Sequence, residues 1–305
     1  MTRSRSFAET LGAAVDRTSP ICLGIDPRPT LLPRAVYPTG VPFDSLSEAE
    51  VARGYVCFAE ALIEEGRDII GIVKPQVAFF EQQLGPGFEA FVNVCRLART
   101  AGCVVIADVK RGDIGTTAEA YADAYLAPRG AQPPLADAVT VNPYLGRDGI
   151  MPFVTTAQSH GGGVFVLVKT SNPSSADYQD RATGDRRVFE IVADDVESLS
   201  RQTAGADHYG VVGAVVGATH PDELARLRTR MPSCWFLVPG YGAQGAGAAE
   251  AAPAFDPDGH GAIVNASRSL NYPWGAGVAP EDWKERIRSA MLRMREELLR
   301  ARDQS

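Results

Sequence analysis

VVIADVKRGDIGTT, residues 104–117, changes from an apolar run to a charged turn within a short stretch. Its first part is rich in Val and Ile, which is typical of a parallel strand covered by helices on both faces. Charged residues follow, and the chain then turns into a segment whose threonines can cap a helix or bind a ligand. The stretch therefore predicts one strand–helix unit with charged side chains at the carboxyl end of its strand.

Seven further short apolar runs, each bounded by turn residues, occur along the chain. They are ICLGID at 21–26, IIGIVKP at 69–75, AVTVNP at 138–143, VFVLVK at 164–169, VVGAVVGA at 211–218, CWFLVPG at 234–240 and AIVNAS at 262–267. Most of the eight runs are followed by a turn and then by helical periodicity, as at residues 47–66 and 88–101. Eight such units close into a (β/α)8 TIM barrel, so the sequence predicts the α/β class and this fold.

The main alternative fold is a doubly wound open sheet. Against it, the first run lacks a following GxGxxG fingerprint, and polar residues recur at the ends of nearly all eight runs, which in a barrel converge on one site. We expect a single barrel domain over residues 1–305, with long connections at about 27–48 and 172–187 and a last packing helix at about 280–302. Long connections are usually functional or disordered, and we favour a lid for the second because it leaves the fifth strand beside the site.

The composition limits the possible function classes. With 45% hydrophobic residues the chain can bury a full core, and its net charge of −7 with interspersed signs argues against a nucleic-acid surface. No stretch approaches the roughly 18–20 apolar residues that span a bilayer, and the start lacks the apolar segment of a secretory signal. The five cysteines and four histidines show neither a CxxC pair nor metal-like spacing. We therefore expect a cytoplasmic protein that binds a small molecule, with no metal, nucleic acid or membrane.

Charged side chains at the strand ends are the most informative feature. Asp108 and Lys110 lie two residues apart on the third strand, so both side chains point to the same face. Lys74 ends the second strand and brings another cation to the same rim, and Asp113 follows at the turn into a helix. A structural ion pair is one interpretation of Asp108 and Lys110, because attraction can offset the desolvation of a buried pair. Four charges at one rim favour chemistry instead.

The stretch DVKRGDIGTT resembles the DxKxxDIxxT signature of the orotidine 5′-phosphate decarboxylase family. CLGIDPR and IVKPQVAFF are similar to that family's first and second strands, and VLVKTSNPSS, FLVPGYGAQG and IVNASRSL to its fifth, seventh and eighth strand ends. The resemblance extends from about residue 21 to residue 270, and KTSNPSS and VNPYLG resemble the longer bacterial branch. Related hexulose-phosphate synthases and ketogulonate-phosphate decarboxylases share DxKxxD but use Mg²⁺, and Lys74 favours the orotidine enzymes over them.

The resemblance implies an enzyme that decarboxylates orotidine 5′-phosphate to uridine 5′-phosphate in pyrimidine synthesis, without a metal or organic cofactor. Loss of CO₂ leaves an electron pair in the ring plane, which electrostatic interactions must stabilise. Lys110 is implied to be the ammonium beside carbon 6 and the donor of the replacing proton, and Asp108 to lie near the departing carboxylate. Asp26 and Lys74 are implied to bind the ribose hydroxyls, with Lys74 also pairing the aspartates.

The resemblance also implies a homodimer with shared active sites. In the family, the residues that match Asp113, Ile114 and Thr117 reach into the site of the neighbouring subunit. Each active site of this chain is therefore expected to contain groups from two copies.

Phosphate binding is expected at the seventh and eighth strand ends, a frequent anion site of barrels. Gly242 permits close backbone approach, Gln244 can bridge phosphate and base, and Ser267 and Arg268 can bind the phosphate. The alternative is that PGYG forms only a tight turn. Ser171 resembles the serine that hydrogen-bonds the amide edge of the pyrimidine.

Several residues keep open interpretations. Lys169 could form a Schiff base as in aldolase barrels, but the resemblance gives it no such role. Asn142 is expected either to line the pocket floor or to fix the fourth turn, and His220 to cap the sixth helix. A catalytically silent nucleotide-binding barrel would keep the phosphate site but lose the charged residues, all of which are present.

Overall fold

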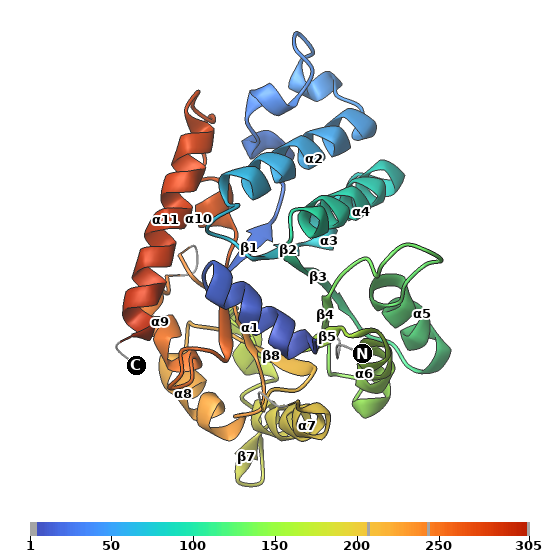
Figure 1. The fold of residues 1–305 in the computed structure, drawn as a ribbon, viewed down its shortest axis with the longest axis vertical. Coiled ribbons are helices and arrows are strands. Elements are labelled where there is room, and N and C mark those ends of the chain that lie inside the picture. The colour runs from blue at the N-terminus through green and yellow to red at the C-terminus, as the bar shows by residue number, and fades with distance from the viewer. Residues whose placement is uncertain (1–4, 206–207, 243–244, 304–305) are drawn as a thin grey trace.

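Eight parallel strands form a closed barrel in the order β1-β10-β9-β8-β5-β4-β3-β2 (Figure 1). The computed structural model describes residues 5–205, 208–242 and 245–303. The barrel strands are β1 (Ile21–Ile25), β2 (Ile72–Pro75), β3 (Val104–Arg111), β4 (Ala138–Val141), β5 (Gly163–Lys169), β8 (Val212–Val216), β9 (Phe236–Val238) and β10 (Ala262–Ala266). Each predicted apolar run coincides with one of these strands, so the predicted (β/α)8 barrel is confirmed.

Helices surround the barrel on its outside (Figure 1). They are α1 (Phe7–Arg17), α2 (Glu48–Glu65), α3 (Val77–Glu81), α4 (Leu84–Thr100), α5 (Gly115–Leu126), α6 (Arg147–His160), α7 (Val188–Thr203), α8 (Pro221–Arg230), α9 (Ala248–Ala251), α10 (Arg268–Asn271) and α11 (Trp283–Arg302). The predicted start of α2 is confirmed: Ser47 accepts a hydrogen bond from the Glu50 amide, and the Glu50 carboxylate accepts one from Ser47. No described helix is apolar over enough length to cross a membrane.

The barrel interior is closed at its amino-terminal end by α1, which crosses the middle of the barrel in Figure 1. Phe7, Leu11 and Val15 of α1 pack in one buried cluster with inward side chains of the strands, such as Ile106. Glycine at position 163 is required at the start of β5, because a Cβ there would lie 2.2 Å from the Phe7 ring. Since α1 fills this end, the opposite end is left for a pocket.

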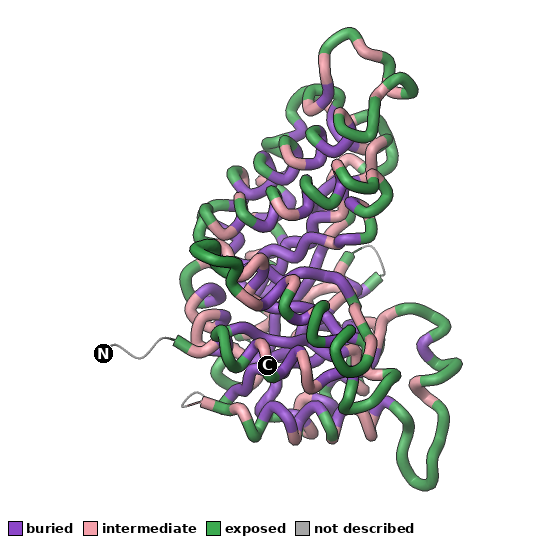
Figure 2. The backbone as a smooth tube through the Cα atoms, turned by 90° about the vertical axis from the view of Figure 1, so that its right-hand side faces the viewer, coloured by how far each residue is buried: buried purple, intermediate pink, exposed green. Residues whose placement is uncertain are grey.

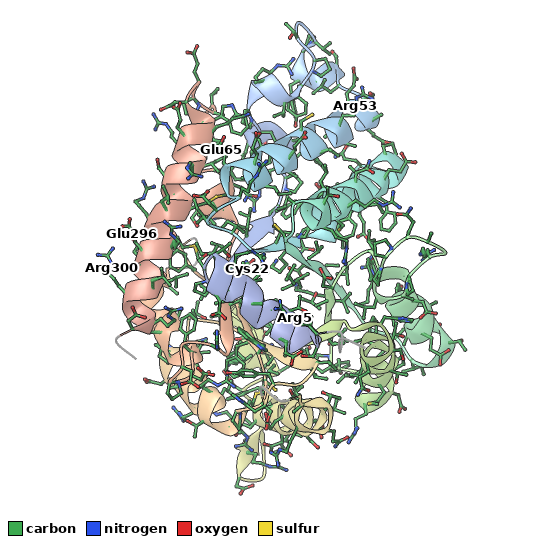
Figure 3. All side chains as sticks on the ribbon, viewed as in Figure 1. Arg5, Cys22, Arg53, Glu65, Glu296 and Arg300 are labelled. Atoms are coloured by element: carbon green, nitrogen blue, oxygen red, sulfur yellow. The ribbon has the colours of Figure 1, made fainter. Side chains whose placement is uncertain are left out.

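A second, larger core lies between the strands and the helices. Figure 2 shows buried backbone through the barrel and exposed backbone on the outer turns of the helices. Figure 3 shows the same contrast in labelled side chains, with Cys22 inside the barrel and Arg53, Glu296 and Arg300 on the outer helices. Burial raises the pKa of the Cys22 thiol to about 12, so it remains a neutral packing group. The five cysteines, all within the described residues, are free thiols.

Both long connections have local structure. The first contains three 3₁₀ turns, η1 (Pro29–Leu31), η2 (Arg34–Val36) and η3 (Phe43–Ser45). The second contains η4 (Pro173–Asp177) and a small hairpin of β6 (Ala182–Thr183) and β7 (Arg186–Arg187), which projects at the bottom of Figure 1. The second connection leaves the barrel at the end of β5, as the lid hypothesis requires, and its closure over the pocket remains a prediction.

Candidate active site

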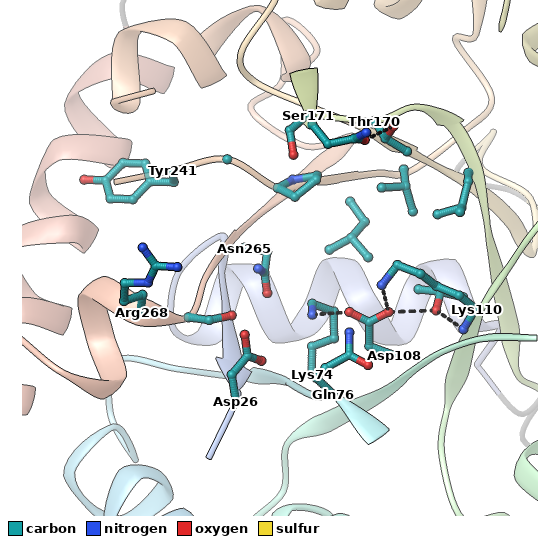
Figure 4. Close-up of a pocket in the computed structure, with 18 of the residues that line it drawn as sticks. Asp26, Lys74, Gln76, Asp108, Lys110, Thr170, Ser171, Tyr241, Asn265 and Arg268 are labelled. Atoms are coloured by element: carbon teal, nitrogen blue, oxygen red, sulfur yellow. Dashed lines mark hydrogen bonds and ion pairs between the residues drawn. The ribbon is translucent and has the colours of Figure 1, made fainter. Parts of the chain in front are cut away.

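A cavity of about 540 Å³ opens at the carboxyl ends of the barrel strands (Figure 4). Its deeper wall includes Leu167, Val215 and Leu237, which pack on the interior core. The rest of its lining is polar and charged and includes Asp26, Lys74, Asp108, Lys110, Ser171 and Arg268. The predicted convergence of strand-end side chains on one site is therefore seen for these six residues.

The Asp108 carboxylate lies between two ammonium groups (Figure 4). Lys74 Nζ is 2.6 Å from Asp108 Oδ2, and Lys110 Nζ is 2.5 Å from Asp108 Oδ1. The side chains of Lys74 and Asp108 are each 7% exposed, whereas that of Lys110 is 46% exposed toward the cavity. Lys110 is therefore the ammonium that an incoming ligand can reach most easily.

Mutual attraction fixes the charges of this group. Burial alone would raise the pKa of Asp108, but the charges of Lys74 and Lys110 outweigh it and hold that pKa well below the usual range. Burial alone would lower the pKa of Lys74, but Asp108 and Asp26 outweigh it and raise that pKa. Asp108 is therefore a carboxylate and Lys74 an ammonium at neutral pH.

Asp26, just after β1, has an unsatisfied buried acceptor. Its backbone is fixed by Asn271, whose Oδ1 accepts a hydrogen bond from the Asp26 amide at 3.0 Å, and by Tyr272, whose hydroxyl donates to the Asp26 carbonyl. Asp26 Oδ1 is buried and has no hydrogen-bond partner among the described residues, and burial raises the pKa of this carboxyl although Lys74 opposes it. Asp26 as a residue lines the cavity, so its carboxyl group lies where a ligand hydroxyl can donate a hydrogen bond to it.

Ser267 and Arg268 lie on the cavity wall at the end of β10, where α10 begins (Figure 4). Gly24 of β1 makes room for this turn, because a Cβ at position 24 would lie 2.0 Å from Ser267 Oγ. Gly242 has a φ of 74° and lies beside Ser269 rather than among the cavity-lining residues. Gln244 lies outside the described residues.

Ser171 lies on the opposite wall, after β5 (Figure 4). The neighbouring Thr170 is held by Gln179 of the second long connection, whose Oε1 accepts from the Thr170 amide at 2.9 Å and whose Nε2 donates to Thr170 Oγ1. Gly217 at the end of β8 leaves space for Ser171, since a Cβ there would lie 2.9 Å from the serine Cβ. Gln179 also lines the cavity, so the second connection contributes directly to the site.

Lys169 points away from the cavity. Its side chain is 1% exposed, and its Nζ lies 2.5 Å from Asp180 Oδ1 and 3.6 Å from Glu223 Oε2. The ammonium also lies 5.2 Å from the centre of the Phe189 ring. These contacts give Lys169 a structural role rather than that of a Schiff-base lysine, because its amine holds the second long connection against α7 and α8.

Two other open interpretations are also resolved. Asn142 is exposed, and its Oδ1 accepts a hydrogen bond from the Tyr144 amide at 3.0 Å, so it fixes the fourth turn. His220 occupies the N-cap position of α8, but its side chain makes no capping hydrogen bond, and the predicted cap is wrong. Pro221 at the first helical position already lacks the amide that a cap would otherwise help satisfy.

Asp113, Ile114 and Thr117 lie outside the cavity of their own chain. The Asp113 carboxylate accepts a hydrogen bond from the Ile114 amide at 2.8 Å, and the Ile114 side chain is 55% exposed. The expectation that Asp113 joins the same rim as Lys74, Asp108 and Lys110 is therefore wrong within one chain. The shared-site interpretation, which places Asp113 in a neighbouring copy, remains a prediction.

Among the cavity residues that were not expected from the sequence are Arg28, Gln76, Thr140 and Asn265. Each follows or interrupts an apolar strand run, and this position is the signal that could have identified them. Thr140 is the clearest case, because it is a polar residue at the inward-facing position two after Ala138.

The fold and cavity together define a (β/α)8 barrel of the enzyme type, with its polar site at the carboxyl ends of the strands. Among the residues that the structure describes, no three His, Cys, Asp or Glu side chains are grouped so that they could hold a metal ion. Residues 19–271 match the family described as "Orotidine 5'-phosphate decarboxylase / HUMPS family". The chain belongs to this family.

Individual relatives extend the match to nearly the whole chain. The orotidine 5′-phosphate decarboxylase of Rhodopirellula baltica is 43% identical, over 96% of this chain and 99% of the relative. The structure of Leishmania donovani OMP decarboxylase superimposes with a TM-score of 0.74 at 34% identity, over 98% of this chain and 99% of that one. The UMP synthase of the same organism gives a TM-score of 0.75 at 34% identity, over 98% of this chain, which spans only 57% of that longer protein.

Proposed function

We propose that this chain decarboxylates orotidine 5′-phosphate to uridine 5′-phosphate in pyrimidine synthesis. Family membership and the names of full-length relatives support the reaction. One observation in the site carries the proposal: Lys110 presents an ammonium to the cavity while its partner Asp108 is held by a second ammonium from Lys74. A carbanion that forms in this cavity would meet a fixed positive charge.

The reaction needs such a charge. The bond between carbon 6 and the carboxyl carbon breaks, CO₂ leaves, and the electron pair stays on carbon 6 in the ring plane. Lys110 then gives a proton to carbon 6 and is reprotonated from water. A fixed ammonium stabilises this charge far more inside a site closed to water than in solution, because the effective dielectric constant is lower.

Asp108 has two tasks in this proposal. It orients the Lys110 ammonium through the 2.5 Å contact. It also lies close to the carboxylate that departs, so that repulsion between like charges is relieved as CO₂ leaves. Lys74, Asp108 and Lys110 act as one coupled group, and their protons should be assigned to the group rather than to single residues.

The other proposed site residues each bind a different part of the substrate. Asp26 and Lys74, which both line the cavity, bind the ribose hydroxyls. Arg268 and Ser267, which line the cavity, bind the phosphate at the eighth strand end. Gly242 and Gln244, which follow the seventh strand in the sequence, complete this phosphate site in the proposal. Ser171 binds the amide edge of the base on the opposite wall. The cavity of about 540 Å³ is within the usual range for a ligand of this size.

We further propose that two copies of the chain share their sites through Asp113, Ile114 and Thr117. Exposed apolar side chains support a contact at this surface: Ile114 is 55% exposed, Tyr144 86% and Leu145 47%. Such a patch at the rim of a site fits a contact between subunits better than it fits free surface.

Mixing two inactive variants tests the shared site. Lys110→Ala and Asp113→Asn subunits are each expected to form dimers with little activity. In a mixed dimer one site receives both changes and the other receives neither, so random exchange should restore roughly a quarter of wild-type activity. If mixing restores no activity although subunit exchange is demonstrated, Asp113 does not act across the dimer.

Absorbance loss of orotidine 5′-phosphate tests the reaction itself. The wild-type protein should convert it to uridine 5′-phosphate, and orotidine without the phosphate should lose catalytic rate as well as affinity, because remote binding energy helps to close the site. Comparable turnover of orotidine would contradict this use of binding energy.

A Mg²⁺-dependent aldolase or decarboxylase of a sugar phosphate is the second candidate, because the matched family is broader than the orotidine enzymes. Excess EDTA separates the two candidates. Persistence of orotidine 5′-phosphate decarboxylation in EDTA excludes the Mg²⁺-dependent alternative. Turnover of a sugar phosphate that EDTA abolishes, without decarboxylation of orotidine 5′-phosphate, favours that alternative.

A further inference from the structure

The end of β3 contains a bulge opposite Thr140. Ala107 pairs with Val139 and Arg111 pairs with Val141, so β3 advances four residues while β4 advances two. The two extra residues of β3 include Lys110, and their amides have no regular acceptor on the neighbouring strand. Something other than the strand ladder must satisfy them.

The Thr140 hydroxyl fills this position. Its Oγ1 accepts hydrogen bonds from the Val109 amide at 3.0 Å and from the Lys110 amide at 2.9 Å. The same hydroxyl donates to Asp108 Oδ1 at 2.9 Å. A hydroxyl has one proton and two lone pairs, so these three bonds use its full capacity. Thr140 is 1% exposed, and water cannot easily replace it.

The backbone at Lys110 needs this support. Its φ is 44°, in the left-handed region that residues other than glycine, asparagine and aspartate rarely occupy. A conformation of this kind persists only where the surroundings hold it. The Thr140 hydroxyl bonds to the amide of this residue and to the carboxylate that its ammonium contacts.

We propose that Thr140 is a positioning residue that fixes the β3 bulge and thereby places the Lys110 ammonium against Asp108. This inference rests on the proposed function, in which Lys110 is the proton donor. A packing role alone does not require a threonine at position 140, because valine would fill the same space. The neighbouring inward residue on β4, Ala138, is apolar. The hydroxyl, not the volume, is the feature that the bulge requires.

Substitutions at Thr140 separate the hydroxyl from the side-chain volume. Thr140→Val should lower kcat by about 10²-fold, the size expected for a small misplacement of a reacting group, while the Kd for uridine 5′-phosphate changes little. Thr140→Ser, which keeps the hydroxyl, should recover most of kcat. If the Thr140→Val protein does not fold, Thr140→Ala takes its place, because alanine also lacks the hydroxyl and has a smaller side chain.

A matched control removes another buried hydroxyl far from the cavity. Ser200 is fully buried, and its Oγ donates to the Ser233 carbonyl at 2.5 Å on the outer side of the barrel. Ser200→Ala should lower thermal stability and leave kcat close to wild type. If Ser200→Ala and Thr140→Val lower kcat equally, the effect at Thr140 is only a loss of stability and the proposal is wrong.

A second background tests whether Thr140 acts through Lys110. If it does, adding Thr140→Val to the Lys110→Ala variant should lower kcat by a far smaller factor than Thr140→Val does in the wild type. An equal cost in both backgrounds, or no recovery in Thr140→Ser, overturns the positioning role. Full turnover of Lys110→Ala alone would instead overturn the proposed function, so the two failures are distinguishable.

Discussion

Lys110 and Lys169 both stand at the carboxyl end of a barrel strand, and each lies 2.5 Å from an aspartate. Their surroundings nevertheless differ. The Lys110 side chain is 46% exposed in the cavity, whereas that of Lys169 is 1% exposed and contacts a carboxylate of α8 and a ring of α7. Residue type and place along the strand therefore do not decide whether a lysine faces a ligand.

The number of extra residues in each bulge accounts for the difference. On β5, Leu167 pairs with Val215 but Lys169 pairs with Val216, so β5 carries one extra residue and its side chains change face. Val215 belongs to the interior core and Val216 to the outer core, which places Lys169 on the helix side. On β3 the bulge has two extra residues, and Lys110 stays on the interior side with Asp108.

Removing the cavity-facing lysine should have the largest effect. Lys110→Ala is expected to bind uridine 5′-phosphate but to lose turnover by several orders of magnitude, because one well-placed electrostatic donor alone is worth about 10²–10³ and this ammonium also supplies the proton. Single-turnover absorbance with orotidine 5′-phosphate measures the loss. A variant that turns over normally would remove the functional difference between the two lysines.

Removing the helix-facing lysine should act mainly on stability. Lys169→Met removes the buried cation that Asp180 and Glu223 share, while Arg187 still lies 2.9 Å from Glu223 Oε1 and 4.0 Å from Asp180 Oδ1. We expect the free energy of unfolding in urea to fall by about 1–3 kcal/mol, less than for a fully buried pair, because Asp180 is partly exposed and Arg187 remains. The double change Lys169→Met with Asp180→Asn should recover part of this loss, since it also removes the carboxylate that lost its nearest cation.

The same variant also tests the assignment of Lys169. Turnover of Lys169→Met should fall much less than that of Lys110→Ala. Any fall should result from a shift of the second long connection, which Lys169 holds through Asp180. A folded Lys169→Met protein with turnover as low as Lys110→Ala would show that Lys169 takes part in the chemistry after all.

Much of the fold could be predicted from the sequence, because Val- and Ile-rich runs and the helical periodicity of residues 47–66 are local signals. The placement of Asp26, Lys74, Asp108, Lys110 and Arg268 followed from the rule that parallel strand ends converge. The bulges could not be predicted, because they depend on pairing between strands rather than on either strand alone. For this reason neither the structural role of Lys169 nor the place of Thr140 in the cavity could be predicted.

The smallest of the expected effects is on the pH dependence of the free energy of unfolding, to which Asp108 in the cavity contributes. The pKa of Asp108 is lowered in the folded protein, because attraction to Lys74 and Lys110 outweighs burial. A lowered folded-state pKa means that the ionised carboxylate stabilises the fold above the unfolded pKa of about 3.9, and that this contribution is lost as pH falls toward the folded value.

Urea unfolding of the wild type and Asp108→Asn between pH 7 and pH 3 measures this contribution. Other carboxylates titrate in both proteins, so the difference between the two free energies of unfolding isolates Asp108. We expect the difference to stay constant down to about pH 4 and to narrow only below it. If it already narrows between pH 7 and pH 5, burial dominates over attraction, and Asp108 is then not held as a carboxylate by Lys74 and Lys110.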